Sequence, residues 1–331
     1  MRTSRVILGA TIAVSVACTG LLTAISVAPA AGAGRVTATS AAPAADAAGA
    51  GNAAGTGNAA GAGNAAGAGN AAGAGNAAGA GTAAGPAGAA SAAGTVNYVA
   101  LGDSYSSGFG AGDYISSGGS CERSTLAYPE QWAAAHSPAT FVSVACSGAT
   151  TADVLASQVS ALSASTTLVS ITIGGNDAGF SSAMETCVFR STSSCLNAVA
   201  AAETFIADQL PARLDTTLQT IAADAPNAKV IVLGYPDLYD LSKSGSCIGL
   251  STSDRVALNG GADDLDAALA AAAQANDDTF ADVRGQFAGH EICDSGSWLH
   301  SVDIFAISSS YHPTAAGQDL GYLPVLTAAA G

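Results

Sequence analysis

The chain is poor in basic residues. Its 331 residues include 10 Lys and Arg against 25 Asp and Glu, which gives a formal net charge of −15 at pH 7. A surface of this sign repels the phosphate backbone, so nucleic acid is not expected as a partner. Anionic membrane surfaces are disfavoured for the same reason, and we interpret the charge as a contribution to solubility.

Metal-binding patterns are also missing. The sequence contains no Cys-x-x-Cys pair, and its four histidines, His136, His290, His300 and His312, are scattered along the chain. Structural zinc sites usually take their ligands from such short spacings. We therefore expect no structural zinc.

Long apolar runs are absent except at the N-terminus. There, two basic residues precede an apolar run that ends in small residues, with Ala-x-Ala at 28–30 and 31–33. This arrangement is typical of a secretory signal peptide, which we predict for residues 1–33. The alternatives are a retained membrane anchor, which the Gly, Thr and Ser within the run disfavour, and lipid attachment at Cys18.

The cysteine count agrees with export. Outside the predicted signal peptide six cysteines remain: Cys121, Cys146, Cys187, Cys195, Cys247 and Cys293. An even number in an exported protein favours disulfides, although the count alone does not select a pairing.

A low-complexity segment follows the predicted signal peptide. Residues 51–86 hold six near-copies of a hexapeptide, of which the first is Gly-Asn-Ala-Ala-Gly-Thr. No large apolar residue is available to build a core, and the frequent glycine opposes a helix. Residues 34–95 are therefore predicted to form a flexible linker, with a silk-like stacking segment as the alternative.

The remaining residues, 96–331, suffice for one compact domain. Apolar strand-like runs alternate along this part of the chain with helical patterns. The strands are expected at 96–101, 141–145, 168–173, 229–234 and 279–283. This alternation predicts an α/β domain, with a mainly parallel five-stranded sheet covered by helices on both faces.

The helical patterns are less regular than the strands. We expect helices near 128–135, from 197 to 223 with a break at Pro211, and at 254–276. The last helix is expected to start at Pro313, because proline suits a first helical position.

Four polar or small residues stand where parallel α/β sheets place their chemistry. Ser104, Gly148 and Asn176 each follow one of the first three expected strands, and His312 precedes the last helix. Acyl transfer needs a nucleophile, a base and donors for a developing oxyanion. Ser104, His312, the Gly148 N–H and the Asn176 amide supply one of each. Taken singly, Ser104 could equally be a helix N-cap and Gly148 a turn glycine.

The motifs around these residues, in this order, resemble those of the SGNH (GDSL) hydrolases. The resemblance is closest to the secreted lipases and esterases of Streptomyces-type actinobacteria and covers about 96–326. It rests on segments 98–108, 127–129, 145–149, 173–180 and 312–318. The absence of Gly-x-Ser-x-Gly argues against the other large lipase fold.

The resemblance implies a flavodoxin-like three-layer α/β/α fold without cofactor or metal. It implies Ser104 as the nucleophile and His312 as the base. The oxyanion hole would consist of the Ser104 N–H, the Gly148 N–H and the Asn176 side chain. The same relatives imply the disulfides Cys121–Cys146, Cys187–Cys195 and Cys247–Cys293.

One position departs from the family pattern. Many members carry Asp three residues before the histidine, where this chain has Ser309. We expect the Ser309 main-chain carbonyl to orient His312, with the carboxylate of Asp303 as a rival.

We expect a secreted monomer that hydrolyses lipid or other acyl esters and is not stably inserted in a membrane. A polysaccharide acetylesterase, a phospholipase and a non-catalytic cell-surface binding module are the alternatives. Phe109, Tyr114, Ile115 and Phe180 are candidates for an acyl site.

Overall fold

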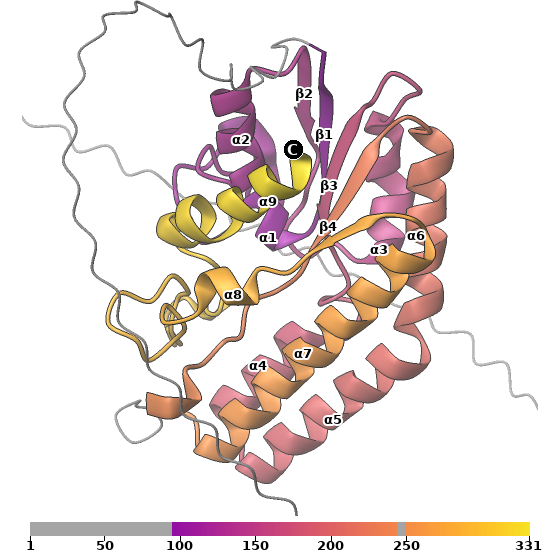
Figure 1. The fold of residues 1–331 in the computed structure, drawn as a ribbon. Helices are drawn as coiled ribbons and strands as arrows, with labels where there is room; N and C mark the ends of the chain where they lie inside the picture. Colours follow the sequence, from indigo (N-terminus) through magenta and orange to yellow (C-terminus); the bar gives the residue numbers. More distant parts are fainter. Residues whose placement is uncertain (1–94, 244–248) are drawn as a thin grey trace, which may run out of the picture. The chain divides into compact units, whose positions relative to one another are not determined.

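The computed structural model describes residues 95–243 and 249–331 (Figure 1). Its centre is a five-stranded sheet in the order β2-β1-β3-β4-β5, in which every neighbouring pair is parallel. The strands are β1 (Asn97–Gly102), β2 (Thr140–Ser143), β3 (Leu168–Thr172), β4 (Lys229–Leu233) and β5 (Thr279–Ala281). The predicted parallel five-stranded sheet is confirmed.

Burial follows the position of each strand in the sheet. The central strands β1, β3 and β4 are buried along nearly their whole length, whereas the edge strand β2 alternates between exposed and half-buried residues. Central strands need apolar side chains on both faces, because helices cover both sides of a parallel sheet. The continuous apolar runs of the sequence thus mark the centre of this sheet.

Two helical layers cover the sheet, as the three-layer prediction requires. Helices α2 and α9 lie on one face, and α6 and α7 lie on the other (Figure 1). The α-helices are α1 (Ser104–Ser107), α2 (Tyr128–His136), α3 (Thr151–Asp153), α4 (Phe180–Phe189), α5 (Thr192–Asp208), α6 (Leu210–Asp224), α7 (Thr252–Ala275), α8 (Arg284–Phe287) and α9 (Leu323–Ala330). The 3-10 and π-helical segments are η1 (Ser116–Cys121), η2 (Val154–Gln158), η3 (Val159–Ala161), η4 (Leu241–Lys243), η5 (Ile307–Ser309) and η6 (Gly317–Tyr322).

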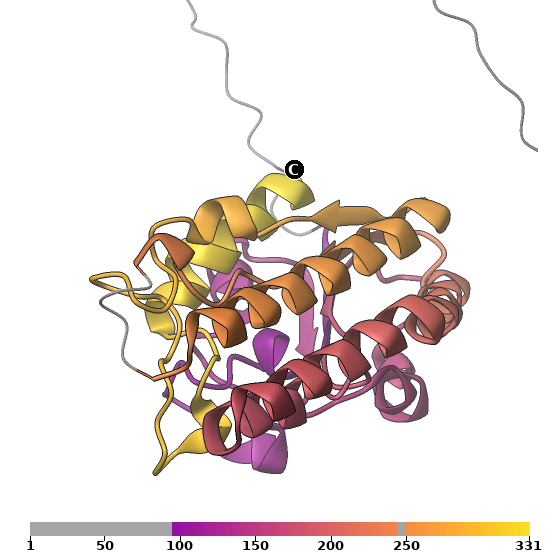
Figure 2. The ribbon, with the colours of Figure 1, turned by 90° about the horizontal axis from the view of Figure 1, so that it is seen from below.

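The helices beyond the carboxyl end of the sheet form a layer of their own. Helix α4 follows β3, and α5 runs beside α4 and α7 (Figure 2). Gly261 makes the approach of α7 to α4 possible, since a Cβ there would lie 2.8 Å from Cε2 of Phe180. This layer overhangs the sheet edge at which the candidate residues stand.

The expected break near Pro211 is confirmed. Helix α5 ends at Asp208 and α6 begins at Leu210, with Gln209 between them at φ −122° and ψ −35°. Proline lacks a backbone N–H, and the first turn of a helix tolerates this loss because those groups have no intrahelical partner there.

The expected start of the last helix at Pro313 is wrong. Pro313 pairs with Leu299 in an antiparallel bridge, and the chain becomes helical only after Thr314. The Thr314 hydroxyl accepts a hydrogen bond from the Gly317 N–H at 3.3 Å, as an N-cap side chain does. Proline is equally compatible with an extended segment, so its fixed φ did not identify a helix start.

Two of the three expected disulfides, Cys121–Cys146 and Cys187–Cys195, are present. Cys293 is also disulfide-bonded, but its expected partner Cys247 lies outside the described residues. The signal peptide predicted for 1–33 and the repeats predicted as a linker also lie outside them. These predictions stay predictions.

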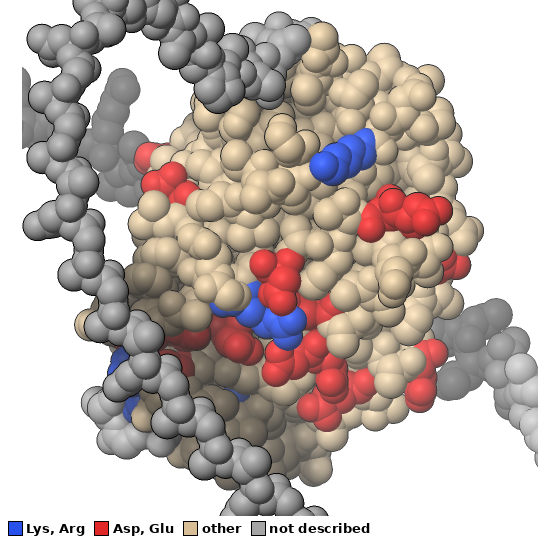
Figure 3. Space-filling model, in the orientation of Figure 1, with Lys and Arg blue, Asp and Glu red and all other residues tan. Residues whose placement is uncertain are grey.

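Acidic side chains outnumber basic ones on the face shown in Figure 3, in keeping with the net charge. Arg284 of α8 gathers three carboxylates, with Asp263 at 2.6 Å, Asp282 at 2.7 Å and the buried Asp266 at 3.5 Å. These ion pairs join α7, α8 and the end of β5.

Candidate active site

Ser104 stands at the carboxyl end of β1, as the first residue of the short helix α1. The turn that presents it requires Gly102, which has φ +123°. A Cβ at Gly102 would lie 2.4 Å from the Thr172 carbonyl oxygen, so only glycine fits. The sequence Gly-Asp-Ser therefore lets β1 and β3 stay in register while the chain turns sharply into α1.

Asp103 holds this turn from the inside. Its buried carboxylate accepts hydrogen bonds from the Tyr105 N–H at 3.0 Å, from the Thr172 hydroxyl at 2.7 Å and from the Tyr235 hydroxyl. Burial raises the pKa of Asp103 to about 6, although these three donors oppose the shift. The contacts fix the backbone on which Ser104 is carried.

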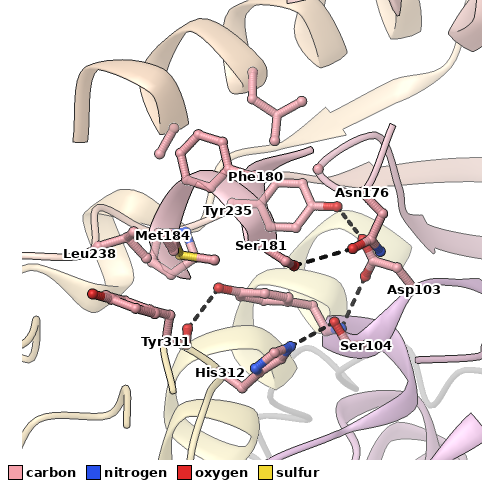
Figure 4. Close-up of a pocket in the computed structure, with 15 residues that line it drawn as sticks. Asp103, Ser104, Asn176, Phe180, Ser181, Met184, Tyr235, Leu238, Tyr311 and His312 are labelled. Carbon is pink, nitrogen blue, oxygen red and sulfur yellow. Dashed lines mark hydrogen bonds between the residues drawn. The ribbon is translucent and has the colours of Figure 1, made fainter. Parts of the chain in front are cut away.

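His312 is placed for proton transfer with Ser104. Its Nε2 lies 2.8 Å from the Ser104 Oγ (Figure 4). Its Nδ1 lies 3.1 Å from the main-chain carbonyl of Ser310. A carbonyl can only accept, so Nδ1 carries the hydrogen and Nε2 accepts the Ser104 hydroxyl. Burial lowers the pKa of His312 to about 4, against an opposing effect of the Ser310 carbonyl. The ring is therefore neutral at pH 7.

The group that orients His312 differs from the expected one by a single residue. The Ser309 carbonyl accepts the backbone N–H of His312 at 3.3 Å, while the imidazole bonds to Ser310. The intervening Tyr311 has φ 70°, and this sharp turn brings the ring back over the second preceding residue. The carboxylate of Asp303 accepts the Phe305 N–H at 2.9 Å and is not bonded to the ring.

The segment that carries His312 is anchored on three sides. The Tyr105 hydroxyl donates to the Tyr311 carbonyl at 2.8 Å. The Tyr239 hydroxyl donates to the Tyr311 hydroxyl at 3.0 Å. The backbone of His300 bonds to the residues around His312 in both directions. Finally, the Phe109 ring meets the imidazole edge to face, with 4.8 Å between centroids. These contacts hold His312 at a fixed distance from Ser104.

Two backbone donors near Ser104 lack partners. In the described part of the chain, the N–H groups of Ser104 and Gly148 donate no hydrogen bond. Gly148 has φ +81° and lies in the turn that the Cys121–Cys146 disulfide holds next to η1. Unpaired amides beside a nucleophile suit an oxyanion, because they need not break other hydrogen bonds first.

Asn176 contributes a third donor. Its Nδ2 donates to the Ala149 carbonyl at 3.0 Å, which uses one of the two amide hydrogens and fixes the side chain. The neighbouring Asp177 accepts from the Thr151 N–H at 2.8 Å and from the Thr151 hydroxyl at 2.5 Å. The motif after β3 is thus tied to the segment after β2. Ser104, Gly148, Asn176 and His312 all line one open groove.

Two differently lined cavities meet at Ser104 and His312. The first is a narrow apolar slot beneath α4 and α7, lined among others by Phe180, Met184, Leu238, Ala262 and Leu265 (Figure 4). The second is the wider groove just described, to which Ser120, Glu122, Ser147 and Glu185 add polar side chains. An ester bound at Ser104 would therefore have an apolar side and a polar side.

The four candidates for an acyl site lie in different places. Phe180 lines the slot and Phe109 lines the groove, but Tyr114 and Ile115 line neither. The other apolar slot residues named above escaped sequence reasoning because they come from α4, from the loop after β4 and from α7. Each of them also reads as an ordinary apolar core residue in its own segment.

Two other kinds of site are not found in the described residues. No group of three His, Cys, Asp or Glu side chains within 95–243 and 249–331 is arranged to hold a metal ion. In the same part of the chain, no helix combines the length and the apolar character needed to cross a membrane.

Comparison with known proteins identifies the family. The sequence pattern of the GDSL-like Lipase/Acylhydrolase family matches residues 100–320. Lipase 1 of Streptomyces coelicolor is 58% identical over 233 residues, which are 70% of this chain and 86% of that protein. The lipase of Streptomyces rimosus is 53% identical over 234 residues, with the same coverage.

Two solved structures support the assignment. A phospholipase A1 from Streptomyces albidoflavus is 52% identical with a TM-score of 0.69, over 70% of this chain and 98% of that one. The extracellular lipase of Streptomyces rimosus is 53% identical with a TM-score of 0.69, over 71% and 99%. With its parallel sheet and its family motifs, the chain belongs to the GDSL-like lipase/acylhydrolase family and is a carboxylic-ester hydrolase.

Proposed function

We propose that this chain is a secreted lipase or esterase that works through a Ser104–His312 dyad and an acyl-enzyme intermediate. The observation that carries the proposal is the relay from Ser104 Oγ to Nε2 at 2.8 Å and from Nδ1 to the Ser310 carbonyl at 3.1 Å. It leaves Nε2 unprotonated and facing the hydroxyl, which is the state a general base needs.

Acylation begins when the Ser104 Oγ attacks the ester carbonyl carbon and Nε2 of His312 takes its proton. The carbonyl oxygen becomes an oxyanion, and the N–H groups of Ser104 and Gly148 and the Asn176 amide donate to it. When the carbon–oxygen bond to the alcohol breaks, the imidazolium returns the proton to the leaving alkoxide. The Ser310 carbonyl accepts from Nδ1 throughout and keeps the ring in one tautomer.

Deacylation repeats these steps with water. Nε2 of His312 takes a proton from the attacking water, the same donors hold the second oxyanion, and the proton then passes to Ser104 as the acid leaves. A peptide carbonyl carries no full charge, so it stabilises the imidazolium less than a carboxylate would. The dyad relies more on the fixed position of the ring than on a charged partner.

The two cavities support a division of the substrate between its acyl and alcohol parts. The slot lined by Phe180, Met184 and Leu265 fits an acyl chain, because apolar walls gain free energy from covering hydrocarbon. The polar groove fits the alcohol portion. The relative described as a phospholipase A1 makes phospholipids one candidate substrate, and triglycerides or decorated polysaccharides remain the alternatives.

The direct test is labelling by a fluorophosphonate probe, combined with hydrolysis of para-nitrophenyl butyrate. The wild-type chain should be labelled once, at Ser104, and Ser104→Ala should lose both labelling and activity while keeping its thermal unfolding profile. Ser182→Ala, which removes an exposed hydroxyl from α4 that lines neither cavity, is the matched control and should retain both. A wild-type chain that takes no label would instead indicate a non-catalytic binding module.

Secretion is part of the same proposal. It is supported by the signal-like residues 1–33, by the disulfides, which form in oxidising compartments, and by the relative described as extracellular. The mature protein in culture medium should begin just after Ala30 or Ala33 by N-terminal sequencing. A product that keeps its first residues and stays with the cells would contradict this.

A further inference from the structure

The loop before His312 ends in an exposed apolar tip, formed by Ile304 and Phe305. Phe305 is 94% exposed and Ile304 61%, the two highest values among the large apolar side chains of the described residues. Single exposed apolar residues are common on protein surfaces, but an adjacent aromatic and aliphatic pair with this exposure is not.

The loop backbone holds this tip in place. The carboxylate and the carbonyl of Asp303 accept the N–H groups of Phe305 at 2.9 Å and of Ala306 at 3.1 Å. The N–H of Asp303 donates to the Ser310 hydroxyl at 2.9 Å, which closes the loop at its base. Because the backbone bonds are made within the loop, both apolar side chains are left pointing outward.

The tip adjoins the entrance to the candidate active site. Ile307 and Ser308, which follow the tip after Ala306, line the groove that contains Ser104 and His312. Ile304 itself lines a second groove together with Val188 from the end of α4. The next residue of α4, Phe189, is 52% exposed. Ile304 and Val188 thus bring the loop and the end of α4 together at this second groove, beside the residues of both segments that line the active-site groove.

We propose that the apolar tip inserts into the surface of aggregated neutral or zwitterionic lipid and so brings the groove to its substrate. The proposal rests on the proposed function, since long-chain esters are held in such aggregates and not in free solution. An aromatic and a branched aliphatic side chain gain free energy on leaving water, and this gain needs no charge on the lipid.

The charges near the tip favour an uncharged or zwitterionic surface over an anionic one. Residues 291–311 contain no Lys or Arg, and Asp303 lies beside the tip. Arg190 is the basic residue that lines the adjoining groove, within a chain of net charge −15. The segment between the predicted signal peptide and the domain is a poor cover for the tip, because residues 34–94 contain no aromatic residue, Leu or Ile.

Binding to vesicles in the Ser104→Ala background tests the proposal without hydrolysis of the lipid. The parent should co-sediment with phosphatidylcholine vesicles, and this binding should persist at high salt. Ile304→Ser/Phe305→Ser should weaken the partitioning by about tenfold or more. Val142→Ser, which removes an exposed apolar side chain from strand β2, is the control and should bind as the parent does.

Three results would overturn the proposal: no vesicle binding by the parent, equal losses in the tip variant and the control, or binding that needs anionic lipid and fails in high salt. A dimer in sedimentation velocity that the tip substitutions dissociate would also overturn it, in favour of self-association.

Activity provides an independent readout of the same variants with Ser104 intact. Ile304→Ser/Phe305→Ser should keep its kcat/KM on dissolved para-nitrophenyl acetate and lose rate on emulsified long-chain esters. Equal losses on both substrates would contradict a role at the lipid surface. If no variant hydrolyses either ester, the proposed function has failed, whereas the vesicle measurement still decides whether the tip binds lipid.

Discussion

The main-chain carbonyl of Ser310 lies 3.1 Å from Nδ1 of His312, so a peptide group orients the imidazole. No side-chain substitution can remove this acceptor. We therefore expect Ser309→Ala to keep most of the wild-type kcat on para-nitrophenyl butyrate, and Asp303→Asn to do the same. His312→Ala should lose nearly all activity.

Ser310→Ala is the informative companion to these variants. It keeps the carbonyl but loses the hydroxyl that holds the Asp303 N–H at 2.9 Å, which should cost about 1 kcal/mol of stability in denaturant unfolding.

A fall in kcat of more than about 100-fold in Ser309→Ala would show that the Ser309 hydroxyl is required, and the proposed dyad would have to be abandoned.

Asn176→Ala should lower kcat by about 10²–10³ with a smaller change in KM, because one oxyanion donor is lost and the others remain. The Asn176 amide also donates to the Ala149 carbonyl, so the variant's fold should be checked by near-UV circular dichroism. An unchanged kcat with a weaker affinity for a non-reactive substrate analogue would assign Asn176 to substrate binding alone.

The acid limb of the pH–kcat/KM profile should lie well below the usual histidine range. The base must be unprotonated, and burial lowers the pKa of His312 to about 4, so activity should fall only as the pH drops toward that value. Phe109→Ser, which exposes the His312 imidazole to water, should move the acid limb to a higher pH, toward about 6.5.

Asp103 is a second buried group whose ionisation must be separated from that of His312. The pKa of Asp103 is raised to about 6, so its ionisation could also produce a limb near that value. Asp103→Asn would then abolish the limb, which would contradict its assignment to His312. The pH dependence of stability cannot separate the two groups, because their effects oppose each other. The pKa of His312 is lower in the folded than in the unfolded chain, so protonation of His312 favours unfolding. The pKa of Asp103 is higher in the folded chain, so protonation of Asp103 favours folding.

Ala262→Leu should shift the substrate preference toward short acyl chains. Ala262 is buried on α7 and lines the apolar slot, so a larger side chain fills space that a long acyl chain would occupy. The ratio of kcat/KM for para-nitrophenyl decanoate to that for the acetate should fall by about tenfold or more. Ala267→Leu, on the exposed side of the same helix, is the control; an unchanged ratio in Ala262→Leu would place the acyl chain elsewhere.

Much of the architecture was predictable from the sequence because its signals are local. Continuous apolar runs marked the buried strands, and the break near Pro211 followed from the missing N–H of proline. Ser104, Gly148 and Asn176 could be placed at one edge because parallel strands end at the same side of a sheet. Their catalytic roles remain proposals that the variants above address.

Other features depend on contacts between residues far apart in the chain, and only the tertiary structure decided them. The slot joins Met184 of α4, Leu238 of the loop after β4 and Leu265 of α7, and none of these residues carries a signal in its own segment. The choice of Ser310 over Ser309 depends on the φ of 70° at Tyr311, which bonds from Tyr105 and Tyr239 support. Local propensity indicates which residues can form a turn or a hydrogen bond. Packing against side chains that are distant in the sequence determines which of these turns and hydrogen bonds form.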